Sequence, residues 1–199
     1  MGINSFSPSD FMANIDNLGG PQRSHKFIVE VTPPTSLNSS VNYSTIEFLA
    51  MGASIPARTL ATTSHRYGGQ YALEVPYETT YENVALKFMN TNDWKPRTFW
   101  NDWFNHIQNM TTYNIQYYKK LIGTVKISVF DDEAAAPSPG LERFKVTLHE
   151  AWPKTISNMD LGWESSEIST FDVDMQYSWW TSESSGTSTF GGGLTEGVQ

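Results

Sequence analysis

The sequence contains no cysteine, few charged residues and no long apolar run. Without cysteine, disulfide scaffolds, thiolate metal sites and cysteine nucleophiles are excluded. No stretch of about eighteen apolar residues is present, so we expect no membrane-spanning helix. The first residues, Met1–Phe6, have neither a basic start nor an apolar run. We therefore expect no signal peptide and a protein synthesised in the cytoplasm.

The composition that remains is globular and aromatic. Hydrophobic residues make up 39% and aromatic residues 14% of the 199 residues, and seven are tryptophan. Aromatic side chains dominate both cores and interfaces, so this abundance favours extensive protein–protein contact. The formal net charge of −8 argues against general attraction to nucleic acid. An acidic surface is still compatible with a protein that must lie beside DNA without holding it.

Alternating polar and apolar residues predict antiparallel strands with one buried face. The alternation is clearest over Glu142–Glu150, ended by Trp152-Pro153, and over Ser169–Trp179. A further strand is expected over Ile46–Ile55, which is mostly apolar. The turn signal Gly68-Gly69 lies between two short β-like segments and predicts a hairpin.

One amphipathic helix is predicted after residue 94. Phe99, Trp100 and Trp103 recur at helical spacing together with further apolar residues, and Asp93 is suited to cap the first turn. A single apolar stripe normally packs on the core. Because Trp100 beside Phe99 widens the stripe, these three residues are also candidates for contact with a neighbouring subunit.

The chain is predicted to form a single mainly β domain over residues 25–180, an antiparallel sandwich or barrel with the helix packed on it. Residues 1–24 are expected to form an N-terminal arm with a short helix from Ser9 to Asn17. Residues 181–199 are rich in Ser and Gly and are expected to be a flexible tail, because they bury too little to become ordered alone.

No pattern predicts a catalytic, cofactor-binding or metal site. The histidines are scattered without metal-ligand spacing, and no serine lies in a nucleophile elbow. The acidic run Asp131–Glu133 lacks the alternating ligands and central glycine of a calcium loop. Asp172 and Asp174 lie two apart on one strand, which marks a solvent face more often than a glycosidase pair. We therefore expect a protein that is not an enzyme and needs no cofactor.

A set of motifs in the second half of the chain resembles the tail tube protein family of contractile-tailed bacteriophages. These are a strand that runs into an aromatic-Pro step, a short turn with an apolar-Xaa-Trp step, and a final strand that opens Thr-Phe-Xaa-Val. They correspond here to Val146–Pro153, Met159–Trp163 and Glu167–Tyr177, preceded by Thr98–Trp103 and Gly123–Val129.

The resemblance implies a virion protein whose hexameric rings stack into a tube, with sheath and baseplate proteins as partners. Double-stranded DNA would cross the lumen without specific binding, and no small-molecule substrate is implied. Carboxylates in the lumen would repel phosphate, and the acidic candidates for that position are Asp172, Asp174, Glu82 and Glu74. The N-terminal arm and the Ser36–Ser44 loop are expected to contact the next ring.

Other functions remain open at this point. Within the assembly class, the chain is also compatible with a baseplate tube initiator, a tail-terminal ring protein or the tube of a related injection system. A carbohydrate-binding β-sandwich would instead be a monomer with a concave aromatic patch. A hydrolase is disfavoured because no nucleophile and base are arranged together.

Overall fold

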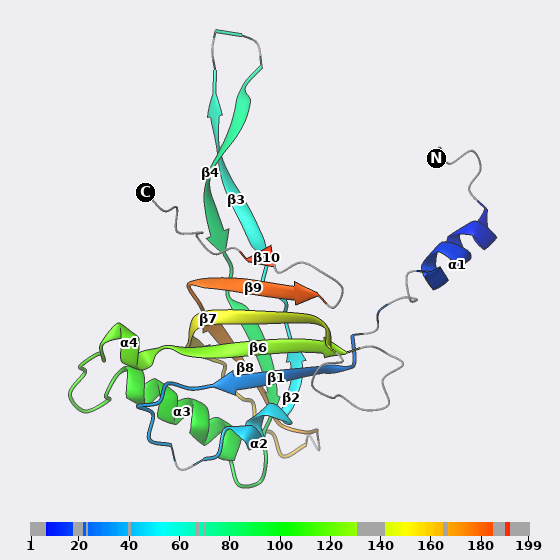
Figure 1. The fold of residues 1–199 in the computed structure, drawn as a ribbon. Helices are drawn as coiled ribbons and strands as arrows, with labels where there is room; N and C mark the ends of the chain where they lie inside the picture. The colour runs from blue at the N-terminus through cyan, green and yellow to red at the C-terminus, as the bar shows by residue number, and fades with distance from the viewer. Residues whose placement is uncertain are drawn as a thin grey trace.

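The computed structural model describes residues 7–17, 22, 24–39, 41–66, 68–69, 71–130, 142–164, 167–184 and 190–191. Within these ranges the chain is mainly β and antiparallel, with helices at the periphery, as the sequence predicted (Figure 1). The strands are β1 (Phe27–Thr32), β2 (Ala50–Ala53), β3 (Arg58–His65), β4 (Leu73–Tyr81), β5 (Val84–Met89), β6 (Gly123–Phe130), β7 (Glu142–Ile156), β8 (Thr170–Gln176), β9 (Trp179–Ser184) and β10 (Phe190–Gly191). The helices are α1 (Pro8–Asn17), α2 (Ser44–Glu47), α3 (Lys95–Ile107) and α4 (Tyr118–Leu121).

The strands of the body follow the order β1-β6-β7-β8-β5-β2, with β9 beside β7 and β10 beside β9. The long strand β7 joins two sheets. Its first part, Phe144–His149, pairs with β6 on one side and β9 on the other, while Trp152–Ile156 pairs with β8. Strand β7 therefore belongs to both sheets, and the inward faces of the two sheets enclose the core.

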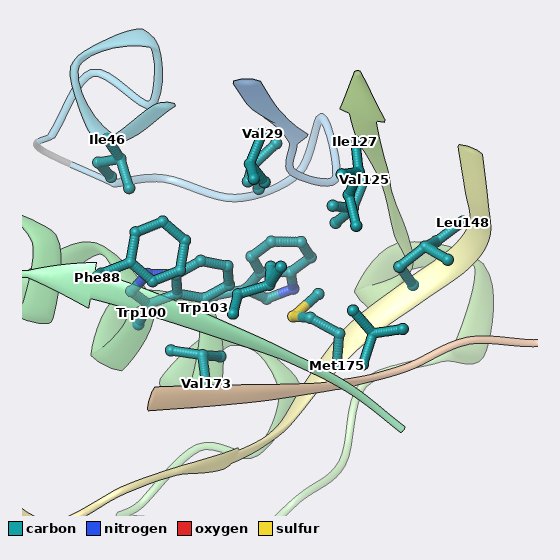
Figure 2. Packing of buried hydrophobic residues seen from close by; sticks show 14 of the residues in the cluster. Val29, Ile46, Phe88, Trp100, Trp103, Val125, Ile127, Leu148, Val173 and Met175 are labelled. Carbon is teal, nitrogen blue, oxygen red and sulfur yellow. The ribbon is translucent and has the colours of Figure 1, made fainter. Parts of the chain in front are cut away.

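Helix α3 closes this core with its aromatic stripe. Phe99, Trp100 and Trp103 are fully buried, and the two indole rings stack with centroids 5.6 Å apart. Figure 2 shows both rings between side chains from β1 and β6 and side chains from β8. The wide stripe thus fills the space between two sheets, so the three aromatic residues are core residues, as a single stripe normally is, and they are too buried to contact a neighbouring subunit.

Four local predictions differ from the structure. The Ser169–Trp179 segment is divided between β8, which ends at Gln176, and β9, which begins at Trp179. The Ile46–Ile55 segment is not one strand, because Ile46 lies in α2 with its side chain in the core and β2 begins only at Ala50. Strand β7 continues past Pro153 to Ile156. The register of β7 against β8 shifts beside Pro153. A proline is tolerated at such a bulge because its missing N–H is not needed for a hydrogen bond between the strands. Asp93 accepts a hydrogen bond from Lys95 (2.8 Å), and Trp94 occupies the N-cap position of α3 without a capping hydrogen bond from its side chain.

The ends of the domain also differ from the predicted boundaries. Helix α1, Pro8–Asn17, agrees with the helix expected in the arm. Strand β9 continues to Ser184, so ordered structure extends beyond residue 180. Most of the predicted tail and the acidic run after Phe130 lie outside the described residues.

Candidate assembly surfaces

A long hairpin projects from the body. Among the described strands, β3 and β4 pair with each other alone, and they extend well clear of the two sheets (Figure 1). Strand β3 follows β2, and β4 leads into β5, so the hairpin is an outward continuation of the β2–β5 ladder. The hairpin predicted from Gly68-Gly69 is confirmed, and it is longer than the short strands expected there.

The hairpin is exposed on both faces. The apolar side chains of Leu60, Leu73 and Tyr77 all face solvent, and Leu73 is 58% exposed. Glu74, one of the predicted acidic residues, lies opposite Ser64 and is also exposed. An isolated two-stranded ribbon is marginally stable in water, and its open edges are free to pair with another chain. The hairpin is therefore a surface that gains stability from a partner.

Two of the predicted acidic residues share one outer face of the sheet. Asp172 and Asp174 alternate with buried residues along β8, so both carboxylates point away from the core. Across the ladder, Lys87 lies opposite Asp172 and Ala85 opposite Asp174. On the other side of β8, Thr155 lies opposite Asp174, next to the exposed Lys154. The face therefore carries the two carboxylates with a lysine on each neighbouring strand.

The other two acidic candidates are separated from this pair. Glu82 is exposed where β4 leads into β5, and its carbonyl oxygen accepts a hydrogen bond from the Tyr177 hydroxyl (2.8 Å). Burial raises the pKa of Tyr177 to about 12. Glu74 lies farther out on the hairpin. The structure thus brings Asp172 and Asp174 together, places Glu82 near the end of the same β5–β8 ladder, and leaves Glu74 apart.

The bend in β7 depends on a residue that the sequence analysis missed. Glu150 has a left-handed backbone (φ 54°), and the register of β7 against β6 shifts around it. Its carboxylate accepts hydrogen bonds from the hydroxyls of Tyr118 (2.9 Å) and Ser178 (2.7 Å). One signal was available, because Glu150 occupies a position where the alternation of the strand requires an apolar residue. A polar residue there indicates a bulge.

Two further kinds of feature would bear on function in the part of the chain that the structure describes, a metal-ligand cluster and a membrane-spanning helix. No group of three His, Asp or Glu side chains is arranged to hold a metal ion within those ranges. Their helices include none that is long and apolar enough to cross a membrane. The surfaces that distinguish this molecule are therefore the hairpin, the acidic sheet face and the exposed apolar patches.

Comparison with known proteins agrees with this geometry. No curated protein sequence matches the chain. One solved chain from the six-fold symmetrised anti-feeding prophage baseplate superposes with a TM-score of 0.57 at 20% identity, covering 83% of this chain and 97% of that chain. A chain of the sheath–tube complex of an extracellular contractile injection system gives 0.57 at 15% identity, covering 90% and 99%. An Hcp protein crystal structure gives 0.51 at 12% identity, covering 82% and 95%.

These structures share the fold of the chain. A family model described as phage tail tube protein matches residues 22–183, from the end of the N-terminal arm almost to the end of β9. The match takes in both sheets, α3 and the projecting hairpin. The chain therefore belongs to the phage tail tube protein family.

Proposed function

We propose that this protein is a structural subunit whose hexameric rings stack into the hollow tube of a phage tail, through which DNA leaves the virion. The observation that carries the proposal is the hairpin. It exposes apolar side chains on a ribbon that is marginal by itself, and the natural partner for such a ribbon is another copy of the same chain. The role needs no catalysis. Sheath and baseplate proteins are the expected partners outside the tube.

The two ends of the subunit favour head-to-tail stacking. The hairpin leaves the body at the Val84 end of β5, while the other end of that strand lies beside the start of β8. There, Trp94, Leu161 and Ile168 line a hollow and are exposed, and Trp163 is fully exposed nearby. Apolar surfaces at opposite ends make a heterologous contact, which repeats without closing and so builds a filament of rings.

The sheet face of Asp172 and Asp174 is the proposed lumen wall. Carboxylates there repel the phosphates of passing DNA and avoid the counterion release that lysine and arginine would produce. Lys87 offsets part of this negative charge. The exposed Glu82, at the end of the same β5–β8 ladder, adds a further carboxylate to the proposed wall. Glu74 belongs to the lumen only if the hairpin continues the wall into the next ring.

Negative-stain electron microscopy of the concentrated protein, with its elution volume from a sizing column, tests the assembly. Rings with six-fold symmetry or hollow tubes are expected. Leu73→Asp with Val75→Asp should abolish stacking and leave the circular dichroism spectrum unchanged. The matched control adds two carboxylates to the exposed side of α3 through Asn101→Asp and Asn105→Asp, and it should assemble normally.

The outcome also separates the members of the assembly class. Long tubes indicate the main tail tube, whereas rings that stop after one or two layers indicate a baseplate initiator or a terminal ring. A strictly monomeric wild-type protein, even when added to preformed tube ends, contradicts the proposal. Saturable sugar binding by that monomer would favour the carbohydrate-binding alternative.

The lumen assignment has its own test. Asp172→Lys with Asp174→Lys should give tubes that retain double-stranded DNA in a filter or mobility assay, with retention that falls steeply as salt rises. Asp172→Asn with Asp174→Asn is the neutral control and should retain much less. If the lysine variant assembles and retains no more DNA than wild type, these residues do not line the lumen.

A further inference from the structure

The body has an apolar opening between the two strands that end its sheet path. Among the described strands, β1 pairs only with β6 and β2 only with β5, so the edges of β1 and β2 face each other without a ladder. A cavity of about 320 Å³ opens there. Its large apolar lining residues, which define the β1–β2 slot, are Phe27, Met51, Ile55, Ile127 and Val129. Met51 is 53% exposed, so the slot presents apolar surface to water.

The N-terminal helix carries a matching apolar face. Phe11, Met12 and Ile15 fall on one side of α1, and Met12 is 58% exposed. Helix α1 lies well away from the sheets in Figure 1. A helix of ten residues is shorter than the roughly 12–15 residues that an isolated helix needs in water, so α1 requires packing to persist.

The arm begins at the slot. Gln22 and Ser24, at the root of the arm, line the slot, and the Gln22 amide donates a hydrogen bond to the Phe130 carbonyl (3.0 Å). The large lining residues of the slot are apolar, like the exposed face of α1. An apolar helix face tethered at the rim of an apolar opening is suited to cover it.

We propose that α1 of one copy docks its Phe11–Met12–Ile15 face into the β1–β2 slot of a second copy. The occupant is a neighbour because α1 extends away from the slot of its own chain instead of folding back over it (Figure 1). The seven residues 18–24 reach at most about 25 Å, which suits an adjacent subunit in a ring or the next ring. This inference rests on the proposed tube assembly, which supplies that neighbour.

The family match begins at residue 22, so α1 lies outside the part of the chain that the family shares. The proposed docking would add a contact to those made by the body and the hairpin. Exchange of a terminal arm ties copies together at little cost once they are assembled, because the body contacts then hold the arm of one copy close to the slot of the next.

Cysteine cross-linking tests the contact directly, since the chain has no cysteine of its own. A Met12→Cys protein and a Met51→Cys protein are mixed, concentrated and oxidised. A disulfide-linked dimer on a non-reducing gel is expected from the mixture and can arise only between copies. The control mixture pairs Met12→Cys with Asn101→Cys, an exposed position on α3, and should give little dimer.

The double variant Met12→Cys with Met51→Cys distinguishes exchange from self-docking. Ladders of cross-linked oligomers support the inference, and a compact monomer with an internal disulfide overturns it. Dimer yields equal to the Asn101 control also overturn it. Microscopy of the wild type decides the proposed function separately, so tubes without the cross-link refute only the docking of α1.

A second measurement compares the assembly of variants substituted on the two opposite faces of α1. Phe11→Asp should weaken assembly by about tenfold or more, as loss of one buried aromatic side chain predicts. Ala13→Asp places the same charge on the opposite face of α1 and should assemble as wild type does. Equal assembly by both variants would show that the apolar face is not in contact.

Discussion

The close approach of Gly123 to its neighbours gives the sharpest test of the packing. Gly123 begins β6 directly beneath the Trp103 ring, whose indole N–H donates to the Leu121 carbonyl (3.0 Å). A Cβ added at Gly123 would lie 2.9 Å from Trp103 Cη2 and closer still to the Thr32 carbonyl oxygen. Gly123→Ala must therefore displace the backbone of β1 or the ring that fills the core.

Overpacking of this kind costs about 1–3 kcal/mol. For a chain of this size, each kcal/mol lowers Tm by about 2–4 °C, so Gly123→Ala should lower Tm by about 2–12 °C. Thermal and urea unfolding followed by tryptophan fluorescence measure the change. The clash can be relieved by movement of the β1 backbone or of the Trp103 ring. Movement of the ring should also change the tryptophan emission of the folded variant.

Gly162→Ala is the matched control. Nothing lies within 4 Å of a Cβ at Gly162, so this substitution should change stability by no more than about 0.5 kcal/mol. If Gly123→Ala and Gly162→Ala unfold at the same temperature and denaturant concentration, the tight contact between β6, β1 and α3 is not present in the protein.

Three further predictions concern other parts of the molecule. Glu150→Ala should destabilise the fold by about 1 kcal/mol in urea unfolding, because it removes the carboxylate that accepts from two hydroxyls and leaves them only their hydrogen bond to each other (2.8 Å); Glu150→Gly should cost less, because glycine accepts the left-handed backbone. Because the pKa of Tyr177 rises from about 10 in the unfolded chain to about 12 in the fold, stability should fall between pH 10 and pH 12, as the unfolded chain loses its proton first. The urea midpoint of Tyr177→Phe should fall less over the same interval. Trp163→Ala should leave unfolding unchanged and weaken stacking by about 2 kcal/mol, measured by the protein concentration at which tubes form.

Regular periodicity made part of the fold predictable. Strand β8 follows its alternation because one face packs on the core, and α3 follows its apolar stripe for the same reason. The outward placement of Asp172 and Asp174 came from that alternation alone. Where a helix or strand buries one face, its apolar residues recur with the period of that element, and this period can be read in the sequence.

The features that sequence patterns missed depend on contacts between distant segments. The stripe that contains Trp100 favours a core position but is also compatible with an interface, and the space between the two sheets decides for the core. Strand β7 passes Pro153 because the register shifts there, and that shift depends on β8. The slot could not be foreseen, since it follows from which strand edges are left unpaired.

The hairpin, the slot and α1 have a common physical consequence. Within the body, β5 buries every second side chain, whereas the ribbon that continues its ladder buries almost none. The subunit thus folds with apolar surface that only other copies can cover, and ordering that surface adds to stability when they bind. By mass action, Tm should rise with protein concentration. Phe11→Asp and the Leu73→Asp, Val75→Asp variant should each reduce this dependence, while Gly123→Ala should lower Tm at every concentration and preserve the slope. A concentration-independent Tm for the wild type would mean that these surfaces gain no stability from other copies and do not drive assembly.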